Sequence, residues 1–149
     1  MSSFRVSAFF ALVLALLAGC SQAVAGARGP TGAPAPAAAA ESFMRLAGEK
    51  DYTGMGRVFG TTKGSVLQRD PAGDVERRMY AMASVLQNEG FTIRGEEPVP
   101  GRVGAAVRSM VRITHNGRAT DVPFTMVRGP EGRWYVEEVG LEAVTSPKQ

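Results

Sequence analysis

Residues 103–126 read VGAAVRSMVRITHNGRATDVPFTM, and this stretch decides the fold. Apolar and polar side chains alternate on both sides of Asn116-Gly117, the dipeptide most typical of a two-residue β-turn. The alternation predicts two antiparallel strands that share one apolar face. The first covers residues 103–114, and the second begins at Arg118.

A two-residue turn also predicts the register, because it places His115 directly opposite Arg118. The pairs expected on the apolar face are Val111 with Val122, Ser109 with Phe124, and Val107 with Met126. On the other face Arg112 is expected opposite Asp121, a pair of opposite charges. Both faces therefore support the same register.

Upstream of Gly90 the hydrophobic period is helical. Residues 41–48 form a predicted helix that ends at Gly48, and Asp51 is predicted to cap a second, short helix. Asp74 is predicted to cap a third helix that runs toward Gly90. The apolar stripes of the second and third helices consist of Tyr52, Met55 and Phe59, and of Val75, Met79, Met82 and Leu86.

Downstream of the helices the period is two. Residues 91–96 and 133–141 are predicted as the outer strands, and the face that Trp134 takes is left open. Helices followed by a meander of strands predict an α+β domain, with the helices on one face of an antiparallel sheet.

The first 40 residues differ from the rest in composition. Residues 1–5 carry one positive charge, and the apolar run at residues 6–19 is shorter than the roughly 20 residues that span a membrane. This pattern is typical of a signal peptide. Residues 21–40 are rich in Ala, Gly and Pro and are predicted to be a disordered tether. The folded domain is then expected at residues 41–146.

The signal-like segment ends in Leu17-Ala18-Gly19-Cys20, which resembles the lipobox of bacterial lipoproteins. The resemblance implies cleavage before Cys20 and attachment of acyl chains to that residue, which would anchor the protein stably in a bilayer. It also implies a place in the cell envelope, and in the outer membrane if the source has two membranes, since Ser21 rather than Asp follows. Cys20 is the only cysteine, so no intramolecular disulfide forms.

Several function classes find no support in the sequence. The net charge is +3, without the run of basic residues that marks nucleic-acid binding. The only histidine, His115, is expected in solvent at the hairpin tip, and no further residues are spaced to bind a metal ion with it. No cofactor is expected. In residues 60–65 (GTTKGS) the Lys precedes the Gly, unlike in a phosphate-binding loop. The Thr61–Ser65 loop is interpreted as a connector, and the alternative is that it lines the mouth of a pocket.

Two segments carry a further resemblance. Residues 43–52 (FMRLAGEKDY), with Met55 and Phe59 after them, and residues 132–136 (GRWYV) resemble the opening and closing segments of nuclear transport factor 2-like domains. The resemblance implies a curved sheet that wraps around the helices as a cone, often with an apolar pocket. The residues expected to line such a pocket are Tyr52, Tyr80, Ser109, Phe124, Met126 and Trp134.

Three functions are considered. The first is a non-catalytic envelope lipoprotein whose domain binds a small apolar ligand or a partner protein. The second is an isomerase- or dehydratase-like enzyme, with Glu137 or Glu138 pointing inward near Tyr52 or Tyr80; adjacent strand residues face opposite ways, so the two glutamates would not act as a pair. The third is a homodimeric adaptor that uses the sheet face carrying Arg108, Met110 and Arg112.

Overall fold

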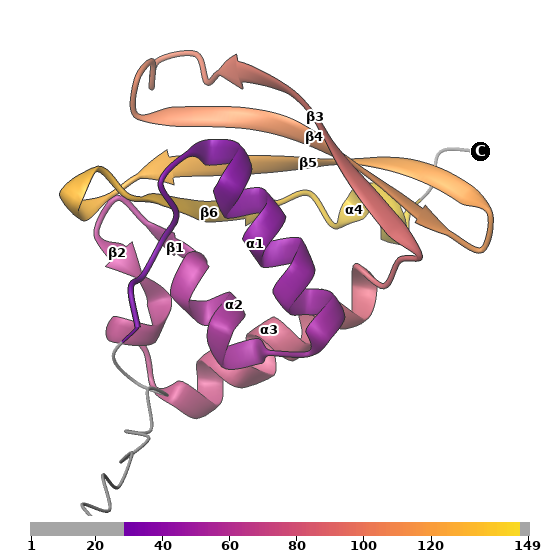
Figure 1. The fold of residues 1–149 in the computed structure, drawn as a ribbon, viewed down its shortest axis with the longest axis horizontal. Coiled ribbons are helices and arrows are strands. Elements are labelled where there is room, and N and C mark those ends of the chain that lie inside the picture. Colours follow the sequence, from indigo (N-terminus) through magenta and orange to yellow (C-terminus); the bar gives the residue numbers. More distant parts are fainter. Residues whose placement is uncertain (1–28, 147–149) are drawn as a thin grey trace, which may run out of the picture.

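Three helices lie on one side of a curved four-stranded antiparallel sheet in the computed structural model, which describes residues 29–146 (Figure 1). The first helix packs directly on the sheet, and the third packs against the other two helices. The helices are α1 (Pro36–Glu49), α2 (Tyr52–Val58) and α3 (Ala72–Val85). The strands, in spatial order, are β3 (Gly90–Pro98), β4 (Ala106–His115), β5 (Arg118–Arg128) and β6 (Trp134–Val139). The smaller elements are β1 (Gly60–Thr61), β2 (Gly64–Ser65), the 3-10 turns η1 (Val66–Gln68) and η2 (Pro130–Gly132), and α4 (Glu142–Thr145). The predicted α+β class is confirmed.

The central hairpin has the predicted register. His115 pairs with Arg118, and all four pairs expected further along the strands are present. Asn116 and Gly117 have φ values of 50° and 72°, the positive pair that a type I′ turn requires. On the outer face, Arg112 donates two hydrogen bonds of 2.7 Å to the carboxylate of Asp121.

The core lies between the helices and the inner face of the sheet. Phe43 of α1 is fully buried and contacts two other rings, with centroid distances of 5.8 Å to Phe59 and 6.0 Å to Phe124. Met55 and Met79 bring α2 and α3 into the same cluster. Gly32 lies so close to Tyr135 that a Cβ there would sit 2.8 Å from the phenol ring.

The predicted start of the domain at residue 41 is wrong. Helix α1 begins at Pro36, a residue type suited to the first helical turn because it lacks an N–H that would be unpaired there anyway. Ala39 and Ala40 are fully buried, and Ala33 forms an antiparallel bridge with Trp134. Residues 29–40 therefore belong to the folded domain. Alanine and glycine are small enough to pack there, although their composition suggested disorder.

Two of the predicted helix signals also need correction. Asp51 caps α2 as expected, accepting a 2.8 Å hydrogen bond from the backbone N–H of Gly54. Asp74, in contrast, lies inside the first turn of α3, where it pairs with Arg77; the N-cap residue is Pro71. Helix α1 continues through Gly48 to Glu49, and α3 ends at Val85, five residues before Gly90.

The strand predicted from residue 103 begins only at Ala106. Val103 is 77% exposed and lies in a loop where Gly101 and Gly104 both have positive φ. Those glycines turn the chain, so the alternation expected for Val103 and Ala105 does not form.

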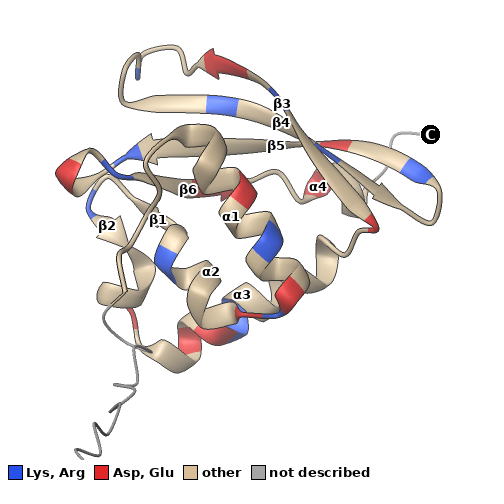
Figure 2. Cartoon of the chain, in the orientation of Figure 1, with Lys and Arg blue, Asp and Glu red and all other residues tan. Residues whose placement is uncertain are grey.

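Charged residues of both signs are distributed over the helices and strands (Figure 2). No helix within residues 29–146 is long and apolar enough to cross a membrane.

Candidate functional site

The interior expected to hold a pocket is filled with side chains. Ser109, Phe124 and Met126 are at most 1% exposed on the inner face of β4 and β5, and none of them lines the groove described below. Trp134 is half-buried and packs against the same core from β6. Four of the six residues predicted to line a pocket are thus core residues.

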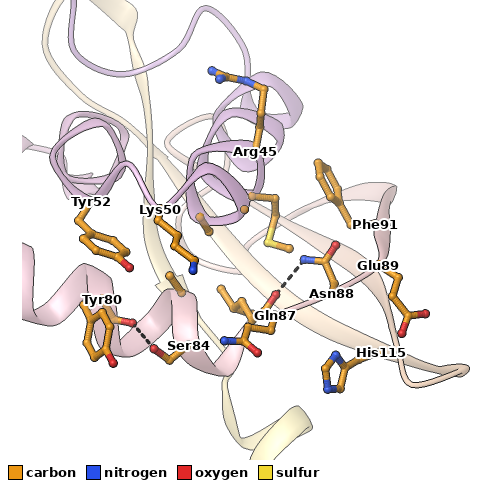
Figure 3. Close-up of a pocket in the computed structure, with 15 residues that line it drawn as sticks. Arg45, Lys50, Tyr52, Tyr80, Ser84, Gln87, Asn88, Glu89, Phe91 and His115 are labelled. Atoms are coloured by element: carbon orange, nitrogen blue, oxygen red, sulfur yellow. Dashed lines mark hydrogen bonds between the residues drawn. The ribbon is translucent and has the colours of Figure 1, made fainter.

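The other two, Tyr52 and Tyr80, line a groove between α1 and α3 (Figure 3). Its volume is about 620 Å³, within the range typical of small-molecule sites. The buried floor is apolar and consists of Met44, Ala47, Ala83 and Leu86. The rim is polar and consists of Arg45, Lys50, Ser84, Gln87, Asn88, Glu89 and His115, with the ring of Phe91 at one end. An apolar floor under a polar rim suits an amphipathic molecule.

The two tyrosines pack edge to face, with ring centroids 5.6 Å apart and planes at 87°. This is a favourable geometry for aromatic rings because the edge of one meets the face of the other. Tyr80 is 57% exposed, so a large apolar ring lies open to solvent at the groove. The hydroxyl of Ser84 donates a 2.8 Å hydrogen bond to the backbone oxygen of Tyr80. This bond fixes the Ser84 side chain along α3.

The end of α1 places Lys50 at the groove. The N–H of Lys50 donates to the carbonyl oxygen of Ala47, and that of Asp51 donates to the carbonyl oxygen of Leu46. These two bonds form a Schellman motif, with Lys50 at its left-handed position (φ 59°). In Figure 3 the Lys50 ammonium points from α1 toward α3, into the groove.

The opposite end of the groove is formed by the hairpin tip. The carboxylate of Glu89 accepts a 2.9 Å hydrogen bond from the N–H of Asn116, while the N–H of Glu89 donates to the carbonyl oxygen of Thr114. These bonds hold the tip against the segment between α3 and β3. His115, expected simply in solvent, is exposed and also lines the groove. The sequence alone did not indicate that Lys50, Glu89 and His115 would line a groove.

Neither glutamate of β6 points into the core. A bulge interrupts the β5–β6 ladder, so that Phe124 pairs with Val139 and Thr125 with Glu138. Paired residues share a face of the sheet, and Glu138 therefore lies on the outer face with Thr125. Glu137, at the bulge, accepts hydrogen bonds of 2.7 and 3.1 Å from Arg102, which raise the pKa of that guanidinium.

The prediction that Glu137 and Glu138 face opposite ways is therefore wrong. The extra residue at the bulge changes the alternation and leaves both carboxylates outside. Among the described residues, the buried polar side chains are those of Ser65, Ser109 and Thr125. The enzyme hypothesis required a carboxylic acid inside the cone, and no carboxylate is buried in the described part of the chain.

The Thr61–Ser65 loop is a tight hairpin made by β1 and β2. Ser65 is buried; its hydroxyl donates a 2.6 Å hydrogen bond to the carbonyl oxygen of Gly56 and accepts one from the N–H of Leu67. These bonds join α2 to η1, a structural role, and the loop does not line the groove.

The outer sheet face exposes one large apolar side chain. Met110 is 42% exposed and pairs with Arg94 on one side and Pro123 on the other. The neighbouring Arg112 is already paired with Asp121. The homodimer through this face stays a prediction.

Three further findings concern metal binding, similarity to known proteins and the predicted lipobox. No group of three His, Cys, Asp or Glu side chains that could hold a metal ion occurs within residues 29–146. Comparison of the chain with protein-family models, with curated proteins and with solved structures found no match. Cys20 and the signal-like segment lie outside the described residues, so the lipobox stays a prediction from the sequence.

Proposed function

We propose that this protein is a lipid-anchored envelope lipoprotein whose domain binds a small ligand with a substantial apolar part. The observation that carries the binding function is the groove between α1 and α3, with its apolar floor and the exposed edge-to-face pair of Tyr52 and Tyr80. Exposed aromatic rings beside a concave surface are typical of binding sites for small molecules.

The proposed binding site differs from the one implied by the nuclear transport factor 2-like resemblance. Helices packed on one face of a curved antiparallel sheet are compatible with that fold, and we propose it as the relationship. The centre of this domain, however, is filled by Phe43 and Phe124. A ligand therefore has room in the groove between α1 and α3 and not in the centre of the domain.

The anchor supports the same function. With residue 29 already part of the domain, the proposed tether between Cys20 and the domain consists of residues 21–28, which reach roughly 30 Å when extended. The groove would then stay close to the bilayer surface. Amphipathic molecules concentrate there, so a nearby groove would meet them readily.

The anchor is tested by Cys20→Ser expressed in the protein's own source. We expect the wild type to partition into detergent with a mass that includes acyl chains, and the variant to keep its signal segment without any acyl mass. A mature, acylated Cys20→Ser product would contradict the anchor.

The binding function is tested by native mass spectrometry of the protein purified from its source. We expect a reproducible additional mass that is lost on denaturation. A ligand-free spectrum, combined with no binding of amphipathic probes, would contradict the binding function.

A further inference from the structure

The charges around the groove are arranged unevenly, and this points to the chemical class of the ligand. We propose that the groove binds an amphipathic anion, with its carboxylate at Lys50 and its apolar tail along the floor toward Phe91. The proposal rests on the proposed binding function and adds the head group and its orientation.

Within residues 29–146, the ammonium of Lys50 is a cation without a partner. Its side chain makes no ion pair or hydrogen bond with any described residue, although it points into the groove (Figure 3). Arg45, the other cation on the rim, is already neutralised by two hydrogen bonds of 3.0 Å to Glu49. An anionic head group would therefore find its charge partner at Lys50.

Hydroxyl groups lie at the same end of the groove. The hydroxyls of Tyr52 and Tyr80 form no hydrogen bond with the described residues, and Figure 3 shows Tyr52 and Tyr80 on the Lys50 side. A phenol hydroxyl can donate to a carboxylate oxygen. The Lys50 ammonium and the Tyr52 hydroxyl, which points toward Lys50 in Figure 3, are the donors available to a carboxylate at this end.

The far end of the groove fixes the orientation of the ligand. Glu89 carries a negative charge there, beside the exposed rim residue His115 and the ring of Phe91. A carboxylate placed at that end would be repelled by Glu89. The head group therefore goes to Lys50, and the tail covers the buried floor residues and ends at Phe91.

A cationic ligand is the main alternative, because the C-terminal ends of both α1 and α3 border the groove and helix C-termini attract cations. Lys50 itself occupies that position at α1. A cationic head group would have to approach this ammonium, which disfavours it.

The experiment compares three probes with the same tail and different head groups: octanoate, octanol and octyltrimethylammonium. Their binding to the full chain is measured by calorimetry, with the protein held in lipid nanodiscs and empty nanodiscs subtracted. Lys50→Met keeps a long unbranched side chain, one atom shorter, and removes its charge. Lys63→Met is the matched control, since Lys63 is an exposed lysine of the β1–β2 hairpin that does not line the groove.

We expect octanoate to bind most tightly and to lose about tenfold in affinity in Lys50→Met, which corresponds to one charge-assisted contact. Binding of octanol should be unchanged by either substitution, and Lys63→Met should bind octanoate as the wild type does. Thermal denaturation of both variants checks that they fold.

Equal binding of octanoate and octanol, preference for the trimethylammonium probe, or unchanged octanoate binding in Lys50→Met would overturn the anionic ligand while leaving the groove as a site. If none of the three probes binds, both the anionic ligand and the groove as the binding site are contradicted.

Discussion

The hydroxyl of Thr31 lies 3.0 Å from the hydroxyl of Tyr135, and the hydrogen bond between them joins the N-terminal segment to β6. Arg133 strengthens the connection by donating to the carbonyl oxygens of Thr31 and Gly32. Ala33 adds two backbone hydrogen bonds of 2.8 Å with Trp134. Residues 31–33 thus act as a short strap along the edge of the sheet.

Removal of this strap should destabilise the domain strongly. A chain that begins at Glu41 loses the strap and the buried Ala39 and Ala40 of α1, and its free energy of unfolding should fall by on the order of 3 kcal/mol. Urea denaturation of fragments starting at Gly29 and at Glu41 measures the difference. Equal urea midpoints for the two fragments would show that the strap contributes nothing.

Two buried serines should respond in opposite ways to alanine. The hydroxyl of Ser109 is buried without a hydrogen-bond partner, whereas that of Ser65 both donates and accepts one. Ser109→Ala should leave the free energy of unfolding unchanged or raise it by up to about 2 kcal/mol, because it removes an unsatisfied polar group. Ser65→Ala should lower it by about 1 to 3 kcal/mol. Chemical denaturation tests both, and a loss in Ser109→Ala as large as that in Ser65→Ala would refute the contrast.

Acid should weaken the ion pair on the outer face. The hydrogen bonds from Arg112 hold the pKa of Asp121 below its ordinary value of 3.8. A carboxyl group whose pKa is lower in the folded state contributes its full stabilisation at pH values above its pKa in the unfolded state. That contribution is lost as the pH falls through its pKa in the folded state. Asp121→Asn should therefore lower the free energy of unfolding at pH 7. Below pH 3.8 this free energy should fall less steeply with decreasing pH in the variant than in the wild type. Urea midpoints across this range measure the effect, and parallel curves for the two proteins would contradict it.

The hairpin was predictable because its determinants are local. Asn116 and Gly117 specify the turn, and the alternation on each side then leaves one register that buries the apolar face. The α+β class followed from the same periodicities. None of these inferences needed information about distant residues.

The strap and the bulge could not be read from the sequence because they depend on distant partners. Ala33 bridges to Trp134, and nothing near Ala33 in the sequence marks an extended segment. The bulge adds one residue to β6 opposite Thr125, and the Glu137-Glu138 dipeptide gives no sign of it. A single extra residue was enough to place both carboxylates on the outer face.

The candidate site was predictable only in part. Tyr52 and Tyr80 were expected to line the pocket that the family resemblance implied, and they line the groove instead. Lys50 was missed because its role depends on two features of the packing of α1 against α3. Its ammonium points into the groove, and it has no charge partner in the described part of the chain. His115 was placed correctly at the hairpin tip, but the sequence did not show which helix end the tip would meet.

The central claim is that the groove between α1 and α3 is the ligand site, and its most direct test is to fill the groove. Ser84→Trp places a large ring in the groove, while Ala81→Trp places the same ring on an exposed part of α3 that does not line it. Native mass spectra of the two variants and the wild type, each purified from the protein's own source, should show the additional ligand mass in the wild type and in Ala81→Trp only. The same ligand mass in Ser84→Trp, with its fold intact by circular dichroism, would contradict the account.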